Sequence, residues 1–348
     1  MPITISYCPY RLLFKHPFGT AHGVRTGTDS IFIRLEENGV FGYGEVTLPP
    51  YLKEKPDAVI DRLHRVGSRE IGNSDALKLL LEDQTLFGPD AQGCRAGVQM
   101  SLSDLIGNQI QLPVNQIIDV NPDKSVATLV TVGLSGLDEL SCKIEELPGS
   151  DALKLKVGHE GSLDTIQRIR QLDGRPLFLD ANQGLSTIQE ALLLVEAAGD
   201  RLLAMEQPFP VKRNDLQKQL QERLGVVIYG DESIQDLNEL ENSVGVFKGL
   251  NIKLMKCGGL DRAKALMDRA AVLGMKVMLG SMSESSLGCT AMAHMAGKAD
   301  IVDLDGPWLI KNDPFQGISM DHGKLIMPHG PGIGAVLRTE LEFKSICA

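Results

Sequence analysis

Five short apolar runs between residues 152 and 256 recur at a nearly constant spacing, and each carries a charged residue at or near its end. These residues are separated by 24, 26, 25 and 22 positions and are Lys156, Asp180, Glu206, Asp231 and Lys253. A spacing of about 25 is the length that one strand, one helix and their two loops occupy. The pattern therefore predicts successive parallel strands of a βα barrel, whose carboxyl ends surround the active site.

The same alternation continues on both sides of these runs. A β-branched run, SVATLVTVGL, precedes them, and KVMLGSMSES and ADIVDLDG follow them, which makes eight strands. Helical patterns lie between the strands at 163–172, 187–199, 214–225, 233–243 and 261–274. We therefore predict a modified TIM barrel of the (β/α)7β type over residues 116–313.

The N-terminal third of the chain lacks this period. Residues 1–115 contain alternating apolar runs at 3–7, 30–36 and 41–46, followed by helical patterns. A meander followed by helices predicts a separate α+β domain, which would cap the barrel. The barrel period stops after residue 313, and we expect residues 314–348 to return to this capping domain and complete it.

The segment 16–30, between the first two alternating runs, is rich in Gly and Thr and carries Arg25. This composition predicts a mobile loop that closes over the barrel as a lid. A plain exposed loop with a solvent-facing arginine is the alternative.

Composition limits the possible partners. The net charge is −10, from 45 acidic and 35 basic residues, which disfavours nucleic acid and anionic membranes as partners. The six cysteines are scattered, as expected for reduced thiols in a cytoplasmic protein. We expect no signal peptide and no membrane span. A small-molecule substrate is therefore expected, and the oligomeric state, including a homo-oligomer, is left open.

Three carboxylates, Asp180, Glu206 and Asp231, are expected to converge at the strand ends. Gathered in a cleft without a counter-charge they would repel one another and lose solvation. A hard divalent cation with oxygen ligands resolves this conflict, and Mg²⁺ is the usual choice. Lys154 and Lys156 are two residues apart and share one side of their strand, whereas Lys253 comes from the opposite side of the barrel.

Further polar residues follow the same strand ends. Asn182 lies two residues beyond Asp180, and the last two strands are followed by Ser281, Ser283, Glu284, Asp303 and Asp305. By the two-residue period Asp303 and Asp305 share one side. Inward polar residues at strand ends are common, so each alone has an ordinary structural explanation. For the two aspartates that alternative is capping of the turn at Gly306.

The ordered set KxK, DxN, ExP, DES and KxxKxGG resembles the enolase superfamily, and within it the muconate-lactonising subgroup. The resemblance covers nearly the whole chain, because GYGE at 42–45 and the Pro-Gly-rich tail are similar to that subgroup's capping domain. It implies that the three carboxylates bind Mg²⁺ and that Lys156 and Lys253 are acid/base residues on opposite faces of the substrate.

The resemblance also implies roles for neighbouring residues. Lys154 would hold the substrate carboxylate and favour an uncharged Lys156, and the strand-end serines would contact substrate. Lys256, three residues past Lys253, should point in a different direction and act in support, as would Asn182. Glu284 matches an acidic position after the seventh strand.

The reaction is less determined than its first half, removal of a proton from carbon beside a carboxylate. Two lysines permit epimerisation, dehydration or cycloisomerisation. The DxD of Asp303 and Asp305 resembles the signature of dipeptide epimerases, in which two aspartates bind a free α-ammonium. An arginine at the position of Arg25 implies L-Ala-Glu-like dipeptides from cell-wall peptides. The alternatives are an o-succinylbenzoate synthase, a muconate-type cycloisomerase and a non-catalytic ligand-binding protein of this fold.

Overall fold

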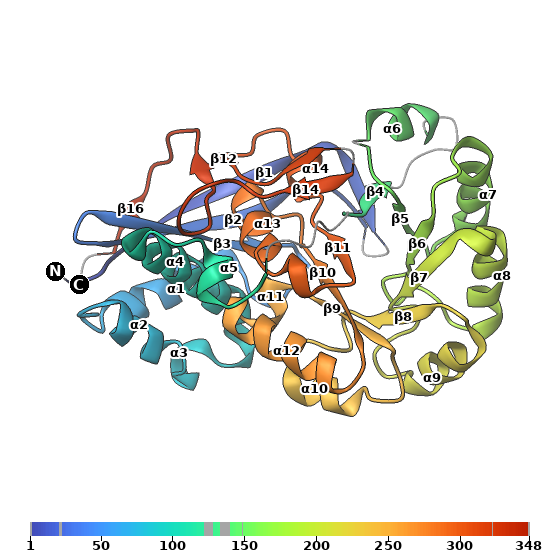
Figure 1. Cartoon of the computed structure of the whole chain (residues 1–348), viewed down its shortest axis with the longest axis horizontal. Coiled ribbons are helices and arrows are strands. Elements are labelled where there is room, and N and C mark those ends of the chain that lie inside the picture. Colours follow the sequence, from blue (N-terminus) through green and yellow to red (C-terminus); the bar gives the residue numbers. More distant parts are fainter. Residues whose placement is uncertain are drawn as a thin grey trace.

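The computed structural model of the chain places an antiparallel sheet with helices beside a barrel of parallel strands (Figure 1). It describes residues 2–20, 23–121, 128–132, 140–147, 149–321 and 323–346. Both termini lie on the side of the antiparallel sheet that is distant from the barrel (Figure 1).

The antiparallel sheet contains both ends of the chain. Its strands, in the order β16-β1-β2-β3, are Lys344–Ser345, Thr4–Thr20, Gly23–Glu37 and Val40–Leu48. Ser345 pairs with Ser6, so the C-terminal segment adds a strand to the N-terminal sheet. Helices cover this sheet: α1 Pro56–Gly67, α2 Ser74–Leu80, α3 Gln84–Phe87, the short 3₁₀ helix Pro89–Ala91 and α4 Gln92–Ile110.

Helix α4 packs closely on β3 because glycines face each other at the contact. A Cβ atom on Gly44 would lie 2.0 Å from the carbonyl oxygen of Gly97. No real Cβ atom tolerates that distance, so larger residues at position 44 would push the helix away from the sheet. The GYGE motif thus has a packing function in addition to presenting Glu45.

The predicted lid loop at 16–30 is wrong in its conformation. Strands β1 and β2 extend through it as a long hairpin, with Phe18 opposite Arg25 and Gly19 opposite Val24. The pairing is interrupted by a register shift between Leu13 and Phe18. Threonine is a good strand former. Pairing between the two strands satisfies the backbone hydrogen bonds of a segment whose Gly-rich composition favours an irregular loop. Residues 21–22 of this segment lie outside the described residues.

Eight parallel strands form the second sheet, as predicted. In chain order they are β4 Val130–Val132, β5 Leu153–Lys156, β6 Leu177–Asp180, β7 Leu202–Glu206, β8 Val227–Gly230, β9 Gly249–Ile252, β10 Lys276–Gly280 and β11 Ile301–Asp303. The amide of Leu129 donates to the carbonyl oxygen of Val302 at 2.7 Å, which joins the first strand to the last. The sheet therefore closes, and the modified TIM barrel is confirmed.

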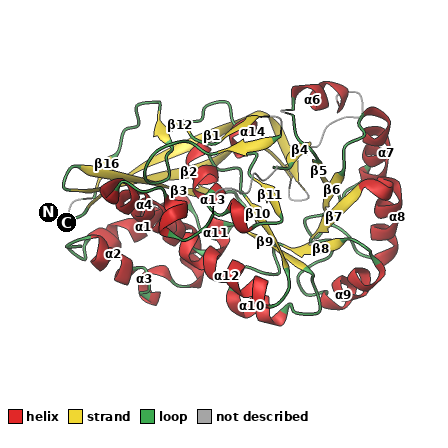
Figure 2. Ribbon diagram, in the orientation of Figure 1, coloured by secondary structure: helices red, strands yellow, loops and turns green. Residues whose placement is uncertain are grey.

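Helices follow the strands on the outside of the barrel (Figure 2). The expected ones are α7 Ser162–Leu172, α8 Ile188–Ala198, α9 Asn214–Arg223, α10 Leu237–Asn242 and α12 Leu260–Val272. The sequence patterns do not predict α5 Val114–Ile117, α6 Leu140–Glu146, α11 Leu254–Cys257, α13 Ser286–Ala293 or α14 Gly306–Leu309. These five helices are short, and a helix of one or two turns is too brief to show a clear 3.6-residue period.

The barrel interior beneath the strand ends is apolar. Phe178, Ala204, Tyr229 and Met278 pack there with Leu129, each from a different strand or its approach. This apolar layer lies beneath Asp180, Glu206 and Asp231, each of which comes two residues after a member of the layer.

The tail crosses from the barrel back to the first sheet. It contains two small antiparallel pairs, β12 Phe315–Gln316 with β15 Val336–Leu337 and β13 Ser319–Asp321 with β14 Lys324–Ile326.

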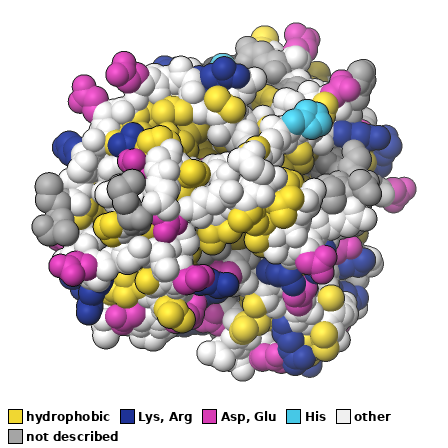
Figure 3. Space-filling model, turned by 60° about the vertical axis from the view of Figure 1, so that its left-hand side comes forward, with side chains coloured by type: hydrophobic (Ala, Val, Ile, Leu, Met, Phe, Trp, Pro, Cys, Tyr) yellow, Lys and Arg dark blue, Asp and Glu magenta, His cyan; other side chains and the backbone are white. Residues whose placement is uncertain are grey.

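Figure 3 shows a face on the side of the antiparallel sheet, where apolar side chains gather toward the centre and charges of both signs surround them. None of the described helices is both long and apolar enough to span a membrane. Five cysteines are free thiols within the described residues.

Candidate active site

A cavity of about 220 Å³ opens at the carboxyl ends of the barrel strands. Its wall comes from both parts of the molecule. Arg25, Tyr51 and Leu52 contribute from the N-terminal part, and most of the remaining lining comes from strand ends: Thr131, Lys154, Lys156, Asn182, Asp231, Lys253, Lys256, Ser281, Ser283, Asp303 and Asp305. The structure therefore gathers most of the sequence-predicted residues at the cavity. Asp180 and Glu206 are fully buried beside Lys154, which lines the cavity, and Glu284 lies outside the lining.

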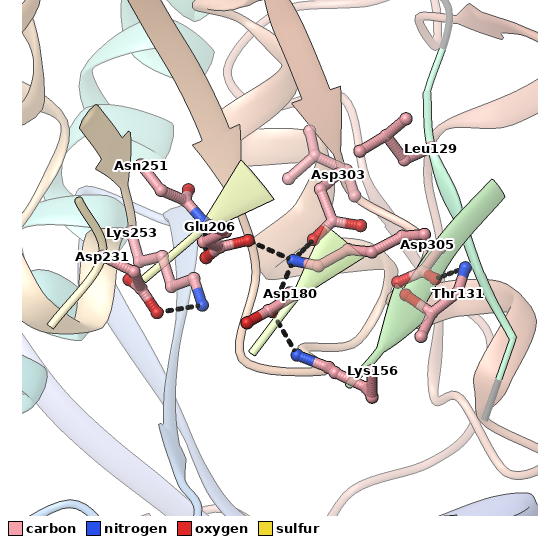
Figure 4. Close-up of polar contacts among 12 residues, drawn as sticks. Leu129, Thr131, Lys156, Asp180, Glu206, Asp231, Asn251, Lys253, Asp303 and Asp305 are labelled. Atoms are coloured by element: carbon pink, nitrogen blue, oxygen red, sulfur yellow. Dashed lines mark hydrogen bonds and ion pairs between the residues drawn. The ribbon is translucent and has the colours of Figure 1, made fainter. Parts of the chain in front are cut away.

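Three carboxylates meet at the base of this site, as the strand period required. Asp180 ends β6 and lies beside Glu206 on β7, and Asp231 follows β8. All three are fully buried or nearly so. Figure 4 shows them on neighbouring strands, with Lys156 beside Asp180 and Lys253 beside Asp231 on opposite sides of the group.

Lys154 lies among carboxylates at the centre. Its Nζ donates to Glu206 Oε2 and Asp303 Oδ2, both at 2.7 Å, and lies 3.0 Å from Asp180 Oδ2. Burial alone would lower the pKa of Lys154, but the charges of Asp180, Asp303 and Glu206 outweigh it and raise the pKa. The ammonium form is therefore strongly favoured, and Lys154 is a fixed positive charge.

The two other lysines each pair with a different carboxylate. Lys156 Nζ lies 2.5 Å from Asp180 Oδ2, and Lys253 Nζ lies 3.1 Å from Asp231 Oδ2. The expectation that Lys256 points elsewhere is wrong, because its Nζ donates to the other oxygen of Asp231 at 2.6 Å. The chain turns into α11 directly after Lys253, and three residues along a helix return almost to the same side.

The carboxylates carry more negative charge than their environment readily accepts. Burial, together with the charges of Asp180 and Asp231, raises the pKa of Glu206 to about 7. For Asp231 burial acts in the same sense, but Lys253 and Lys256 outweigh it and lower the pKa to about 2. Asn251 Nδ2 donates to Glu206 at 2.7 Å, while the buried Oδ1 atoms of Asn251 and Asp303 have no hydrogen-bond partner among the residues that the structure describes.

These donors suit a hard divalent cation. Carboxylate and amide oxygens are the ligands that Mg²⁺ prefers, and Glu206 holds a proton more tightly than usual because burial and the charges of Asp180 and Asp231 outweigh Lys154 and Lys253. Within the described residues no three acidic, His or Cys side chains already form a metal cage, since each carboxylate faces a lysine. The lysines would have to turn aside for all three carboxylates to coordinate one ion.

Asp303 and Asp305 lie on the same wall of the cavity, as expected for positions two residues apart. Asp305 Oδ2 accepts a hydrogen bond of 2.7 Å from the amide of Thr131 on β4. The alternative that it caps the following helix is wrong, because its side chain makes no capping hydrogen bond to α14. Burial and the charge of Asp303 raise the pKa of Asp305 to about 6, so the ionised form of Asp305 would gain from a nearby cation.

The residues after the seventh strand divide between the cavity and the domain contact. Ser281 and Ser283 line the cavity. Glu284 is instead buried behind it, near Glu45 of the GYGE motif, and burial together with the charge of Glu45 raises its pKa to about 8. Glu45 accepts hydrogen bonds from the amide and hydroxyl of Ser285. Glu284 therefore belongs to the contact between the sheet and the barrel.

Arg25 lies at the cavity wall between two aromatic rings. Its guanidinium carbon is 5.5 Å from the ring centre of Phe14 and 5.6 Å from that of Tyr51. Cation–π contacts on both sides restrict a side chain that would otherwise sample many rotamers. The alternative of a solvent-facing arginine is therefore wrong for Arg25.

Several residues of this site are not among those predicted from the sequence, although their spacing from predicted residues could have identified them. Asn251 precedes Lys253 by two and so shares its side of β9, and Glu232 directly follows Asp231. Gln207, next to Glu206, accepts hydrogen bonds from the amides of Asp231 and Ser233 at 3.1 Å. Backbone strain also marks the strand ends, where four non-glycine residues have positive φ: Asn182, Gln183, Gln207 and Ser283.

The fold and the strand-end site define a class of proteins, capped barrels that gather lysines and acidic residues at the barrel mouth. A sequence model described as enolase C-terminal domain-like matches residues 143–341. The chain belongs to this family.

The chain is similar to several dipeptide epimerases. The L-Ala-D/L-Glu epimerase of Bacteroides thetaiotaomicron is 33% identical over 334 residues, which cover 95% of this chain and 87% of the relative. A dipeptide epimerase from Enterococcus faecalis, in complex with Mg and L-Leu-L-Tyr, has a TM-score of 0.88 at 28% identity, over 96% of this chain and 99% of that one. The substrate-liganded L-Ala-D/L-Glu epimerase from Bacillus subtilis has a TM-score of 0.88 at 27% identity, over 97% and 99%.

Proposed function

We propose that this protein is a Mg²⁺-dependent dipeptide epimerase, an isomerase that inverts the α-carbon of the C-terminal residue of a dipeptide. The observation that carries the proposal is the approach of Lys156 and Lys253 to the carboxylate cluster from opposite sides, with Asp303 and Asp305 on the adjoining wall. Similarity to dipeptide epimerases over nearly the whole chain supports it.

Asp180, Glu206 and Asp231 would hold the Mg²⁺ ion. When bound, Mg²⁺ supplies positive charge beside the substrate carboxylate, where negative charge increases as the α-proton leaves. Lys154, a permanent cation at the centre of the site, adds to this stabilisation and orients the substrate carboxylate by a charge-assisted hydrogen bond. Asn182, Ser281 and Ser283 complete the polar wall around it.

Lys156 and Lys253 move the proton. One lysine in its neutral form takes the α-proton from one face, which gives an enediolate, and the other ammonium returns a proton to the opposite face. The product is therefore the opposite epimer, and the roles of the two lysines exchange in the reverse direction. Lys256 supports this chemistry by neutralising Asp231, its hydrogen-bond partner.

Asp303 and Asp305 would bind the free α-ammonium of the dipeptide. A pair of carboxylates on this wall gains from a cationic group, whereas the dicarboxylate substrate of a cycloisomerase would be repelled. Arg25, oriented by Phe14 and Tyr51, would pair with the side-chain carboxylate of a C-terminal glutamate. We therefore propose L-Ala-D/L-Glu as the preferred substrate type, consistent with recycling of cell-wall peptides in the cytoplasm.

Residues 1–115 with the tail 314–348 would act as the capping domain and residues 116–313 as the catalytic barrel. In this division the cap contributes specificity through Arg25, and the barrel contributes the chemistry. The division follows the two sheets, since β16 pairs with β1 and β4 to β11 form the closed barrel.

Incorporation of solvent deuterium tests the proposal directly. Ala-Glu incubated with the protein and Mg²⁺ in D₂O should gain one deuterium at the glutamate α-carbon while both epimers accumulate. N-acetyl-Ala-Glu is the matched control, because it lacks only the α-ammonium and should react very slowly. Equal reaction of the two compounds would refute the dipeptide assignment, and absence of exchange from a panel of free dipeptides would refute the epimerase itself.

A further inference from the structure

Lys253 and Lys256 lie on a short turn that cannot hold its shape alone. Lys253 directly precedes α11, a helix of only four residues, and Lys256 is within it. A single helical turn has little stability of its own, because fixing its backbone costs more than its few hydrogen bonds return. The placement of both ammonium groups beside Asp231 therefore depends on what packs against α11.

Helix α4 of the N-terminal part supplies that support. The carbonyl oxygen of Gly258, where α11 ends with φ +97, accepts a hydrogen bond of 2.7 Å from Arg95 Nη1. The amide of Leu260 donates to Gln99 Oε1 at 2.8 Å. A Cβ atom on Gly258 would lie 2.3 Å from Gln92 Oε1, the end of a flexible side chain of α4 that could move aside, so it is the left-handed φ of Gly258 that favours glycine at this position.

Arg95 is 0% exposed, yet every N–H donor of its guanidinium has an acceptor. Nε donates to the carbonyl oxygen of Leu81 at 3.1 Å, and Nη1 donates to Gly258 and to Asp261 Oδ1. Nη2 donates to Glu82 at 2.6 Å and to Asp261 Oδ2 at 2.8 Å. A planar fork with all five donors engaged allows one orientation only, so Arg95 locates Gly258 firmly.

We infer that Arg95 is a positioning residue that fixes, from the capping domain, the turn carrying Lys253 and Lys256, and thereby governs proton transfer on one face of the substrate. The inference rests on the two-base epimerase proposed above. Lys156 is on β5, between β4 and β6 in the barrel, and its ammonium is held by Asp180. The position of Lys156 does not depend on the turn that carries Lys253 and Lys256. A change at Arg95 should therefore affect proton transfer on the two faces of the substrate differently.

The experiment compares deuterium exchange from the two epimers of Ala-Glu. The variant Lys253→Ala first identifies the epimer whose exchange requires Lys253. Arg95→Lys keeps the charge but has three donors and no planar fork, and it should slow exchange from that epimer at least tenfold more than exchange from the other. Asp104→Asn is the matched control, because Asp104 is also buried on α4. Its carboxylate accepts hydrogen bonds from the backbone amides of Tyr43 and Ile333 and not from the turn. It should affect both epimers equally.

Equal slowing of both epimers by Arg95→Lys would overturn the inference, because it indicates a general structural role. If Arg95→Lys fails to fold, Gln99→Met removes the acceptor for Leu260 and is judged by the same criterion. If the wild-type protein exchanges neither epimer, the epimerase proposal has failed, and the support of the turn is tested by amide hydrogen exchange of residues 254–260. Faster exchange there in Arg95→Lys, but not in Asp104→Asn, supports the positioning role, and unchanged protection refutes it.

Discussion

Acidification should destabilise the protein through one buried histidine, His294, which joins the barrel to the returning tail. Its Nδ1 accepts a hydrogen bond of 3.1 Å from the amide of Asn115, so its proton resides on Nε2, which donates to the carbonyl oxygen of Ile333 at 3.0 Å. Burial lowers the pKa of His294 to about 4 from its ordinary 6.5. A second proton on Nδ1 would face the N–H of Asn115 and remove that hydrogen bond, and only Asn115 Oδ1, 3.2 Å from Nδ1, is placed to accept the new proton.

The effect of pH on the free energy of unfolding follows from the difference between the pKa of His294 in the folded and the unfolded state. Because the folded-state pKa is depressed, the stabilisation is present above the unfolded-state pKa of about 6.5 and is lost as pH falls toward 4. A shift of about 2.5 pKa units corresponds to about 3 kcal/mol in full, of which about 2 kcal/mol is lost between pH 7 and pH 5.

Urea unfolding of wild type and His294→Gln at both pH values isolates this contribution. Carboxylates elsewhere titrate in both proteins, so their effects cancel in the difference between the two unfolding free energies. That difference should fall by about 2 kcal/mol on going from pH 7 to pH 5, because only the wild type must protonate a buried imidazole. A difference that does not change with pH would refute the reasoning, even if His294→Gln is less stable throughout.

Four further predictions concern the proposed reaction. Asp231→Asn should abolish turnover and the rise in melting temperature that Mg²⁺ produces, with an unchanged circular dichroism spectrum; full activity with excess chelator would contradict the metal site. Lys156→Ala and Lys253→Ala should each stop epimerisation but retain deuterium exchange from one epimer, and exchange of both epimers by both variants would disprove the two-base scheme. Asp303→Asn should raise KM for Ala-Glu steeply and leave the already slow N-acetyl compound unaffected. Arg25→Ala should lose a tenfold to hundredfold preference in kcat/KM for Ala-Glu over Ala-Gln, about 1.5–3 kcal/mol, and an unchanged preference would remove Arg25 from substrate recognition.

Repetition makes most of the barrel predictable from the sequence. Each strand repeats the same geometry at a spacing of about 25 residues, so the spacing alone is enough to place Asp180 and Glu206 side by side. The two-residue period of a strand likewise places Asp303 and Asp305 on one wall. These rules are local or periodic, and they need no knowledge of how distant segments pack.

Where the chain departs from the period, the prediction fails for a physical reason. Lys256 is expected to diverge from Lys253, but the backbone leaves the strand there and becomes helical. The hairpin at 16–30 exists because two segments pair with each other, which composition does not reveal. The support of Gly258 by Arg95 joins residues 163 positions apart in the chain. Contacts of that kind form only when the two sheets are assembled, so no local pattern predicts them.

The charge balance of the assembled site explains why these parts belong together. Six carboxylates and five cationic side chains line the cavity or lie directly beneath it: Asp180, Glu206, Asp231, Glu232, Asp303 and Asp305 against Arg25, Lys154, Lys156, Lys253 and Lys256. One negative charge is in excess, which accords with the raised pKa of both Glu206 and Asp305. While all four lysines are protonated, a divalent cation would turn this excess into one net positive charge. This net positive charge is unfavourable in the resting site. It becomes favourable when the substrate carboxylate gains a second negative charge as the α-proton leaves, so the same ion would stabilise the transition state more than the ground state.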